Sequence, residues 1–127
     1  MSIRDNYLEI LKRKDAAAKR SGRNPKDVML MAVTKKHEPD ELKEAIDAGA
    51  TDFGENKVQE LLSKYDEVHP ERWHLIGHLQ TNKVRQIIDK VTMIHSVDSL
   101  KLAREINKRA AAADVVMDVL IEINLAE

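Results

Sequence analysis

The sequence predicts an α/β fold, in which an N-terminal helix precedes five strands that alternate with four helices. The run from Val28 to Thr34 is short and continuously apolar, as in a parallel strand that is covered on both faces. The apolar residues Val58, Leu61, Leu62 and Tyr65 recur at the i, i+3, i+4 and i+7 spacing of an amphipathic helix. Segments of both kinds alternate with short turns between them, so we expect parallel strands joined by right-handed crossovers.

The first half of the chain gives the first helix, strand and helix of this pattern. An N-terminal helix is indicated by an approximate apolar stripe of Tyr7, Leu8, Ile10, Leu11, Ala17 and Ala18, and Gly22 is suited to end it. The turn NPKD leads into the strand over residues 28–34. Pro39 fits the first turn of the next helix, which ends at Gly49.

The second half repeats the alternation. A short strand and turn are expected over residues 51–56, ahead of the amphipathic helix that contains Leu61. RWHLIG is the third strand, and a helix with Val84, Ile87 and Ile88 follows. VTMIHSV is the fourth strand, Asp98 is suited to cap the next helix, and VVMDVLIEINL is the fifth strand. Residues 1–127 are expected to form a single domain.

Two architectures accommodate five such strands. One is a flavodoxin-like open parallel five-stranded sheet with helices on both faces. The other is the first part of a (β/α)₈ barrel, with all helices outside. The periodicity of the sequence does not distinguish them.

The composition excludes several classes of protein. The chain has 127 residues, of which 43% are hydrophobic and 34% charged, and its net charge is −1. A general nucleic-acid binder would usually be clearly basic. There is no cysteine, so thiol catalysis, disulfides and zinc–thiolate sites are excluded. The N-terminal segment is too charged for a signal peptide, and no apolar run approaches the roughly 20 residues that cross a membrane, so we expect a soluble, cytoplasmic protein.

Nucleotide and metal motifs are absent or weak. None of the four glycines belongs to a G-x-G-x-x-G or P-loop pattern. HEPDE resembles a zincin motif only superficially, because its last residue is glutamate and Pro39 interrupts any helix there. For His69, His74 and His78 we expect one buried, hydrogen-bonded ring and two surface ones, and no metal site. A polar loop and helix start over residues 77–86 is suited to anions, although a solvated helix start is the commoner explanation.

The two lysines that end the first strand are the strongest candidates for chemistry. Strand side chains alternate, so Lys35 shares a side with Met31 and Val33, and Lys36 lies on the other side. If helices cover the second side, Lys35 points into the mouth of the sheet. Partial burial lowers a lysine pKa, and a neutral amine forms a Schiff base with a carbonyl. The alternative is a lysine that simply reaches water.

Polar residues end two other strands. Asn56 follows the second strand, where it is suited to cap the next helix, to contact a ligand, or both. On the fifth strand, Glu122 and Asn124 share one side, and Ile121 and Ile123 share the other, which suits packing against helices. An inward polar layer near the carboxyl end of a strand favours a ligand site, and an edge strand with one wet face is the rival interpretation.

Four segments, AVTK, AIDAGATDFGENKVQE, WHLIGHLQTNK and VLIEINLAE, occur in one order and at compact spacing. Together they resemble the pyridoxal-phosphate homeostasis protein family, and SGRNPKDVMLMAVTK resembles that family's entry into its first strand. The similarity covers essentially all 127 residues. No single segment would suffice, but the ordered set is highly specific.

The resemblance implies the N-terminal part of a TIM (β/α)₈ barrel of the alanine-racemase-like type, preceded by a helix, that binds pyridoxal 5′-phosphate (PLP). Lys35 matches the lysine that holds PLP as a Schiff base. Asn56, His74 and Asn124 match positions at or near the cofactor face. The family handles and buffers the cofactor in vitamin B6 homeostasis without an established turnover, so no catalytic residue and no enzymatic activity are expected.

The length of the chain departs from that family. Its members are nearly twice as long and have eight strands, and the phosphate site of such barrels commonly lies in the loops after strands 7 and 8. The family's phosphate ligands therefore correspond to no position here. Two alternative functions remain open, a PLP-dependent racemase-type enzyme and a truncated fragment or interaction module without ligand binding. A racemase needs a second acid/base group positioned across the cofactor. Tyr7 and Tyr65 are the only tyrosines, and both lie on predicted helices rather than in a strand-end motif. We also expect a homo-oligomer, or a companion chain that covers the open barrel edges.

Overall fold

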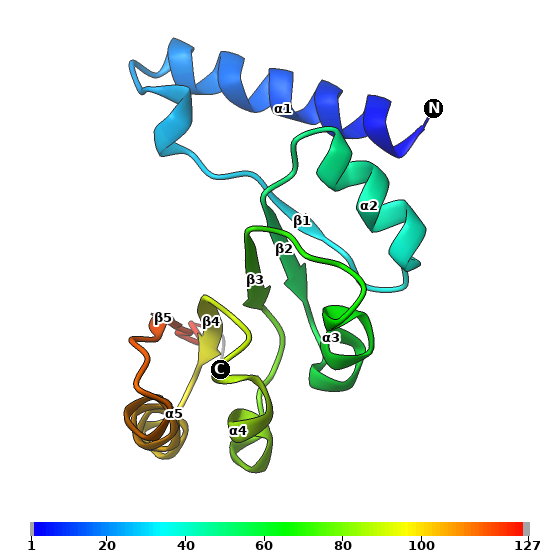
Figure 1. The fold of residues 1–127 in the computed structure, drawn as a ribbon. Coiled ribbons are helices and arrows are strands. Elements are labelled where there is room, and N and C mark those ends of the chain that lie inside the picture. The colour runs from blue at the N-terminus through cyan, green and yellow to red at the C-terminus, as the bar shows by residue number, and fades with distance from the viewer. Residues whose placement is uncertain (1, 126–127) are drawn as a thin grey trace.

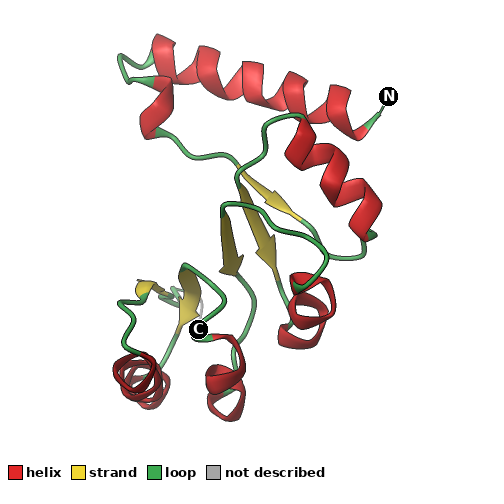
Figure 2. Cartoon of the chain, in the orientation of Figure 1, coloured by secondary structure: helices red, strands yellow, loops and turns green. Residues whose placement is uncertain are grey.

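The computed structural model describes residues 2–125 and shows one sheet with helices packed against it (Figure 1). The elements in chain order are α1 (Ile3–Arg20), η1 (Pro25–Asp27), β1 (Met31–Val33), α2 (Pro39–Asp47), β2 (Asp52–Glu55), α3 (Val58–Tyr65), β3 (Arg72–Leu75), η2 (Thr81–Lys83), α4 (Val84–Ile87), β4 (Met93–Val97), α5 (Leu100–Ala113) and β5 (Asp118–Ile121). The order of helices and strands agrees with the prediction, and two short 3₁₀ turns are added to it. Figure 2 shows the same alternation by element type.

The strand order decides between the two predicted architectures. All pairs are parallel, and the order across the sheet is β1-β2-β3-β4-β5. A flavodoxin-like sheet would have the order 2-1-3-4-5, with helices on both faces. Here every crossover advances by one strand in the same direction, so right-handed connections place α2 to α5 on one face. This is the arrangement of the first five strands of a barrel, and the alternative of a flavodoxin-like sheet is wrong.

The register separates an outer face, which meets the helices, from an inner face. Ala32, Phe53 and Trp73 are in register and pack outward, where the rings of Phe53 and Trp73 meet edge to face at 5.6 Å. Val33, Gly54 and His74 are in register on the inner face. Residues with little exposed surface form the core between the sheet and the helices, and they include Leu42, Ala45, Leu61, Leu75, Val84, Ile87, Ile94, Leu102 and Ile106.

The two edge strands are shorter than predicted. β1 covers only Met31–Val33 of the expected residues 28–34, and β5 covers Asp118–Ile121 of the expected residues 115–125. An apolar composition does not show how many residues form backbone hydrogen bonds with the neighbouring strand. Val116, ahead of β5, is 94% exposed. The expectation that β1 is covered on both faces is also wrong, because Val33 is 46% exposed.

The helix ends confirm some predicted signals and correct one. Gly22 and Gly49 follow α1 and α2 with positive φ angles of 78° and 111°. The N-cap of α5 is Ser99 rather than the predicted Asp98, because the Ser99 side chain accepts a hydrogen bond from the Leu102 N–H at 3.1 Å.

Over residues 2–125, none of the helices is both long enough and apolar enough to cross a membrane.

Candidate functional site

Lys35 is the second residue after β1, at the carboxyl end of the strand, and lies in a tight turn. The Thr34 N–H donates to the Gly54 carbonyl at 3.0 Å, and the His37 N–H donates to the Thr34 carbonyl at 3.2 Å and closes the turn. Lys35 is exposed. Val33 is in register with Gly54 on the inner face, and Thr34 contacts Glu55 on the outer face. Strand alternation therefore favours the inner side for Lys35, and its role as the imine-forming lysine stays a prediction.

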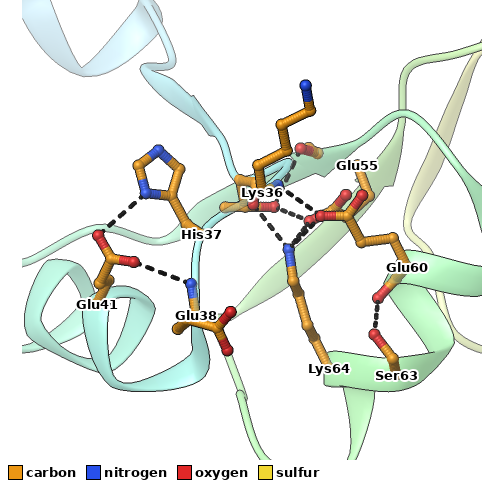
Figure 3. Close-up of polar contacts among 10 residues, drawn as sticks. Lys36, His37, Glu38, Glu41, Glu55, Glu60, Ser63 and Lys64 are labelled. Atoms are coloured by element: carbon orange, nitrogen blue, oxygen red, sulfur yellow. Dashed lines mark hydrogen bonds and ion pairs between the residues drawn. The ribbon is translucent and has the colours of Figure 1, made fainter.

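Lys36 has a backbone conformation that is unusual for lysine. Its φ is 66°, in the left-handed region, which costs a non-glycine residue about 1 kcal/mol or more. The Lys36 N–H donates to the Glu60 carboxylate at 2.6 Å. Figure 3 shows that the Lys36 side chain extends away from the carboxylates of Glu55 and Glu60.

The inner face carries a chain of hydrogen bonds between β2, β3 and β4. Arg72 binds Asp52 through two nitrogens, at 2.7 and 2.9 Å. His74 Nε2 lies 2.7 Å from Asp52 Oδ2, and His74 Nδ1 lies 2.9 Å from His95 Nε2. Asp52 and His74 are fully buried, so these partners replace the water that each group loses.

The surroundings of Asp52 in this hydrogen-bonded network favour its ionised form. Burial opposes ionisation of Asp52, but hydrogen bonds from Arg72, Thr51 and His74 outweigh it and lower the pKa of Asp52 to about 2. An ionised Asp52 can only accept, so His74 Nε2 carries a hydrogen. Burial lowers the pKa of His95, and the neighbouring His74 lowers it further. Between His74 Nδ1 and His95 Nε2, one nitrogen donates and the other accepts, and the tautomers decide which.

Of the three histidines considered in the sequence, His74 is buried and hydrogen-bonded, while His69 and His78 are exposed. This confirms the expectation of one buried ring and two surface ones. His74 is in register with Gly54, two residues before Asn56, so it lies one inward layer deeper than the strand ends. Both of its ring nitrogens have protein partners, and a contact with the cofactor stays a prediction. Among the described residues, no group of three or more histidine or acidic side chains is placed to hold a metal ion.

Asn56 follows β2 and is half-buried. It does not take the capping role that was considered for it, because the N-cap residue of α3 is Lys57, which makes no side-chain capping bond. The backbone of Asn56 lies against Gly77 in the loop after β3, where an added Cβ would lie 2.3 Å from the Asn56 carbonyl oxygen. Beside this contact is an open cavity of about 170 Å³ lined by Asn56, Lys57, Val58, Gln59, His78, Gln80 and Lys83.

Asn124 lies beyond the end of β5 and is exposed. The Glu122 N–H donates to the Val97 carbonyl at 2.8 Å, which continues the pairing one residue past the strand. Val119 lines a groove with Ile106 and Ala110 of α5, so alternate residues of β5 face the helices. Alternation then favours the inner side for Glu122 and Asn124, as predicted from the sequence, and a cofactor contact of Asn124 stays a prediction.

Sequence reasoning missed a largely buried ionic cluster behind the Lys35 turn, formed by Thr34, Glu55, Glu60 and Lys64. Figure 3 shows Glu55, Glu60 and Lys64 of this cluster. A signal for it exists. Phe53 and Glu55 share one side of β2, so a carboxylate had to face α3 within the core. Lys64 stands four residues after Glu60 on that helix and supplies the cation.

Comparison with known proteins agrees with this architecture. Residues 9–126 match the family model described as alanine racemase, N-terminal domain. A pyridoxal phosphate homeostasis protein of Aquifex aeolicus is 40% identical over 98% of the chain and 56% of its own length. The protein of that name from Escherichia coli strain K12 is 38% identical over the same shares. The chain therefore spans little more than half the length of these relatives.

Solved structures give the same result. A protein described as unknown, from Bifidobacterium adolescentis, superposes with a TM-score of 0.84 at 35% identity, over 96% of this chain and 55% of its own. The structure of PipY from Synechococcus elongatus PCC7942 with PLP bound superposes with a TM-score of 0.74 at 33% identity, over 89% of this chain and 55% of its own. The consecutive parallel strands, the helices on one face and the match over residues 9–126 together show that the chain belongs to the alanine racemase N-terminal domain family.

Proposed function

We propose that this chain binds PLP and holds it as a Schiff base on Lys35, as part of a protein that buffers the cofactor in vitamin B6 homeostasis. The observation that carries the proposal is an exposed lysine at the carboxyl end of the first strand of a barrel portion whose structural relative PipY has been solved with PLP bound. In barrels of this kind, ligands bind at the carboxyl ends of the strands. Residues 1–127 act as one unit in this proposal, and the cytoplasm is its compartment.

The residues at the strand ends fit an aldehyde cofactor. When bound, PLP supplies a carbonyl group. Lys35 would hold the cofactor there through its amine, because an amine condenses with a carbonyl to an imine with loss of one water. Asn56 and Asn124 would contact the cofactor from the ends of β2 and β5, and His74 would support the site from one layer below.

The curated relatives support binding of the cofactor without turnover, because they are named homeostasis proteins. The second candidate is a racemase-type enzyme, for which the matching family model provides a reason. It needs an acid/base group across the cofactor. Tyr7 lies on α1 with its hydroxyl 3.5 Å from the Gly49 carbonyl, and Tyr65 lies on α3, so both tyrosines are held on helices. Loss of an amino acid's optical rotation in the presence of the protein and PLP would establish the racemase.

Association is the second part of the proposal. β1 and β5 form the two edges of the sheet, and the exposed residues near them include Met29, Val33, Val116, Leu120, Ile121 and Ile123. Edge strands and apolar surface of this kind usually mark an interface. We expect a homo-oligomer, or a companion chain that covers these edges. Light scattering should give a mass above that of one chain, and Ile121→Asp should lower it, because Ile121 is 74% exposed at the β5 edge. A stable monomer would contradict this part.

The experiment that tests cofactor binding is a spectroscopic titration with PLP and pyridoxal. An imine absorbance should appear with the native chain and with Lys36→Ala, and Lys35→Ala should abolish it. Because charge-assisted hydrogen bonds supply much of the affinity for a phosphate, and the usual loops for it follow strands 7 and 8, both aldehydes should bind this chain with similar affinity. Equal signals from the two lysine variants would reject Lys35. A strong preference for the phosphorylated form would show a phosphate site within these five strands.

A further inference from the structure

The largely buried cluster of Thr34, Glu55, Glu60 and Lys64 holds the backbone on both sides of Lys35. The Lys64 ammonium donates to the Thr34 carbonyl at 2.7 Å. That carbonyl belongs to the peptide unit that precedes Lys35. The peptide unit that follows Lys35 carries the Lys36 N–H, which donates to Glu60 at 2.6 Å. Both peptide units that flank the Lys35 Cα are therefore fixed by two residues of α3.

The two anchors are tied to each other. Lys64 also donates to Glu55 Oε2 at 2.7 Å and to Glu60 Oε2 at 2.8 Å, so its three N–H groups have three acceptors. The Thr34 hydroxyl donates to the same Glu55 oxygen at 2.5 Å. The Lys64 side chain is 7% exposed and that of Glu55 is fully buried, so water competes weakly with these bonds.

The cluster also explains the backbone of Lys36. A lysine keeps a φ of 66° only where its surroundings determine it. The bond from the Lys36 N–H to Glu60 does so, together with the turn closed by the His37 N–H on the Thr34 carbonyl. If Lys36 returned to an extended conformation, the turn would open and the direction of the Lys35 side chain would change.

We infer that Glu60 and Lys64, supported by Glu55, are positioning residues that aim the Lys35 amine at the inner face. The inference rests on the proposed function, since it assigns Lys35 the reactive amine. Glu60 and Lys64 do not touch the cofactor in this account. They act through the two peptide units beside Lys35. Because they already restrict these units, the Lys35 amine loses less conformational entropy when it binds.

Glu60→Ala is the variant that tests this inference. Replacing Lys64 would leave Glu55 as an unpaired buried charge and endanger folding. The Glu60 side chain is 26% exposed, so its removal spares the core. Glu105→Ala is the matched control, because Glu105 is 23% exposed and forms the same i,i+4 type of ion pair, with Arg109. Glu60→Gln keeps an acceptor for the Lys36 N–H and serves as the conservative rescue.

Two measurements on the full chain separate the positioning role from the proposed function. Hydrogen exchange needs no cofactor. We expect the Lys36 amide to be protected in the native chain, to lose about tenfold of that protection in Glu60→Ala, and to keep it in Glu60→Gln and Glu105→Ala. An unprotected Lys36 amide in the native chain, or an unchanged one in Glu60→Ala, would overturn the inference.

Borohydride reduction with pyridoxal provides the second measurement. We expect Glu60→Ala to lower the affinity for pyridoxal about tenfold and to move part of the trapped label from Lys35 to Lys36, while Glu105→Ala matches the native chain. Labelling of Lys35 that is unchanged in Glu60→Ala would overturn the inference. If the native chain takes up no label at all, the proposed function fails, and hydrogen exchange alone decides whether the cluster positions the turn.

Discussion

Replacing Asp52 with asparagine removes the charge at the centre of the hydrogen-bonded chain on the inner face. Asp52 is fully buried and accepts from Arg72 at 2.7 and 2.9 Å and from His74 at 2.7 Å. Burial opposes ionisation, but these bonds, with one from Thr51, lower the pKa of Asp52 from 3.8 to about 2. The asparagine side chain has the same shape and keeps one acceptor, so the perturbation falls mainly on the charge.

The size of the effect follows from that pKa. One pKa unit corresponds to about 1.4 kcal/mol, so a fall from 3.8 to about 2 contributes about 2 kcal/mol to the free energy of unfolding at neutral pH. Because the folded pKa is the lower one, the contribution is complete above about pH 5 and is lost as the pH falls toward 2. It should amount to about 1 kcal/mol at pH 3 and to less than about 0.5 kcal/mol at pH 2.

Urea denaturation of both proteins between pH 2 and pH 7, at one fixed protein concentration, measures this difference. Asp52→Asn should be less stable than the native chain by about 2 kcal/mol at pH 7, and the two should converge below pH 3. Glu105→Gln is the control, because its ion pair with Arg109 is partly exposed to solvent and its loss should change stability by less than about 0.5 kcal/mol. A difference that is absent at pH 7, or that stays constant down to pH 2, would refute the reasoning.

The remaining predictions concern backbone and caps. Gly77→Ala should lower the free energy of unfolding by about 2 kcal/mol in urea denaturation, because the new Cβ would meet the Asn56 backbone at 2.3 Å. Gly54→Ala is its comparison and should cost less, since the atoms it meets are side-chain ends of Met31 and Ile76; equal losses would contradict the account. Ser99→Ala should cost about 1 kcal/mol in the same assay through the lost α5 cap, and Asp98→Ala should cost less than about 0.5 kcal/mol. A larger loss of stability in Asp98→Ala than in Ser99→Ala would identify Asp98 as the cap.

The order of the elements was predictable because each depends on local patterns. The stripe of Val58, Leu61 and Tyr65 lies on α3, and Pro39 opens α2, as expected. The lengths of β1 and β5 were not predictable, because pairing depends on the neighbouring strand rather than on apolar composition. The choice between a barrel portion and a flavodoxin-like sheet needed the strand order, which only the structure shows.

The candidate site was predictable in part. Strand alternation separated the side of Thr34 from that of Val33, and it is the basis for choosing Lys35. One of three histidines was expected to be buried, and the structure shows that it is His74. Its partner Asp52 was not foreseen, because the two residues come from different strands. The link from Lys64 to the Thr34 carbonyl was missed for the same reason, since it joins residues 30 positions apart in the sequence.

Identification of the modified lysine is the most direct test of the central claim. The native chain is incubated with PLP, reduced with borohydride and digested, and the labelled peptide is mapped by mass spectrometry. The account predicts a pyridoxyl group on Lys35, at the end of β1, with Lys36 unmodified. A label on Lys36 with Lys35 free, or no label on either lysine, would contradict it.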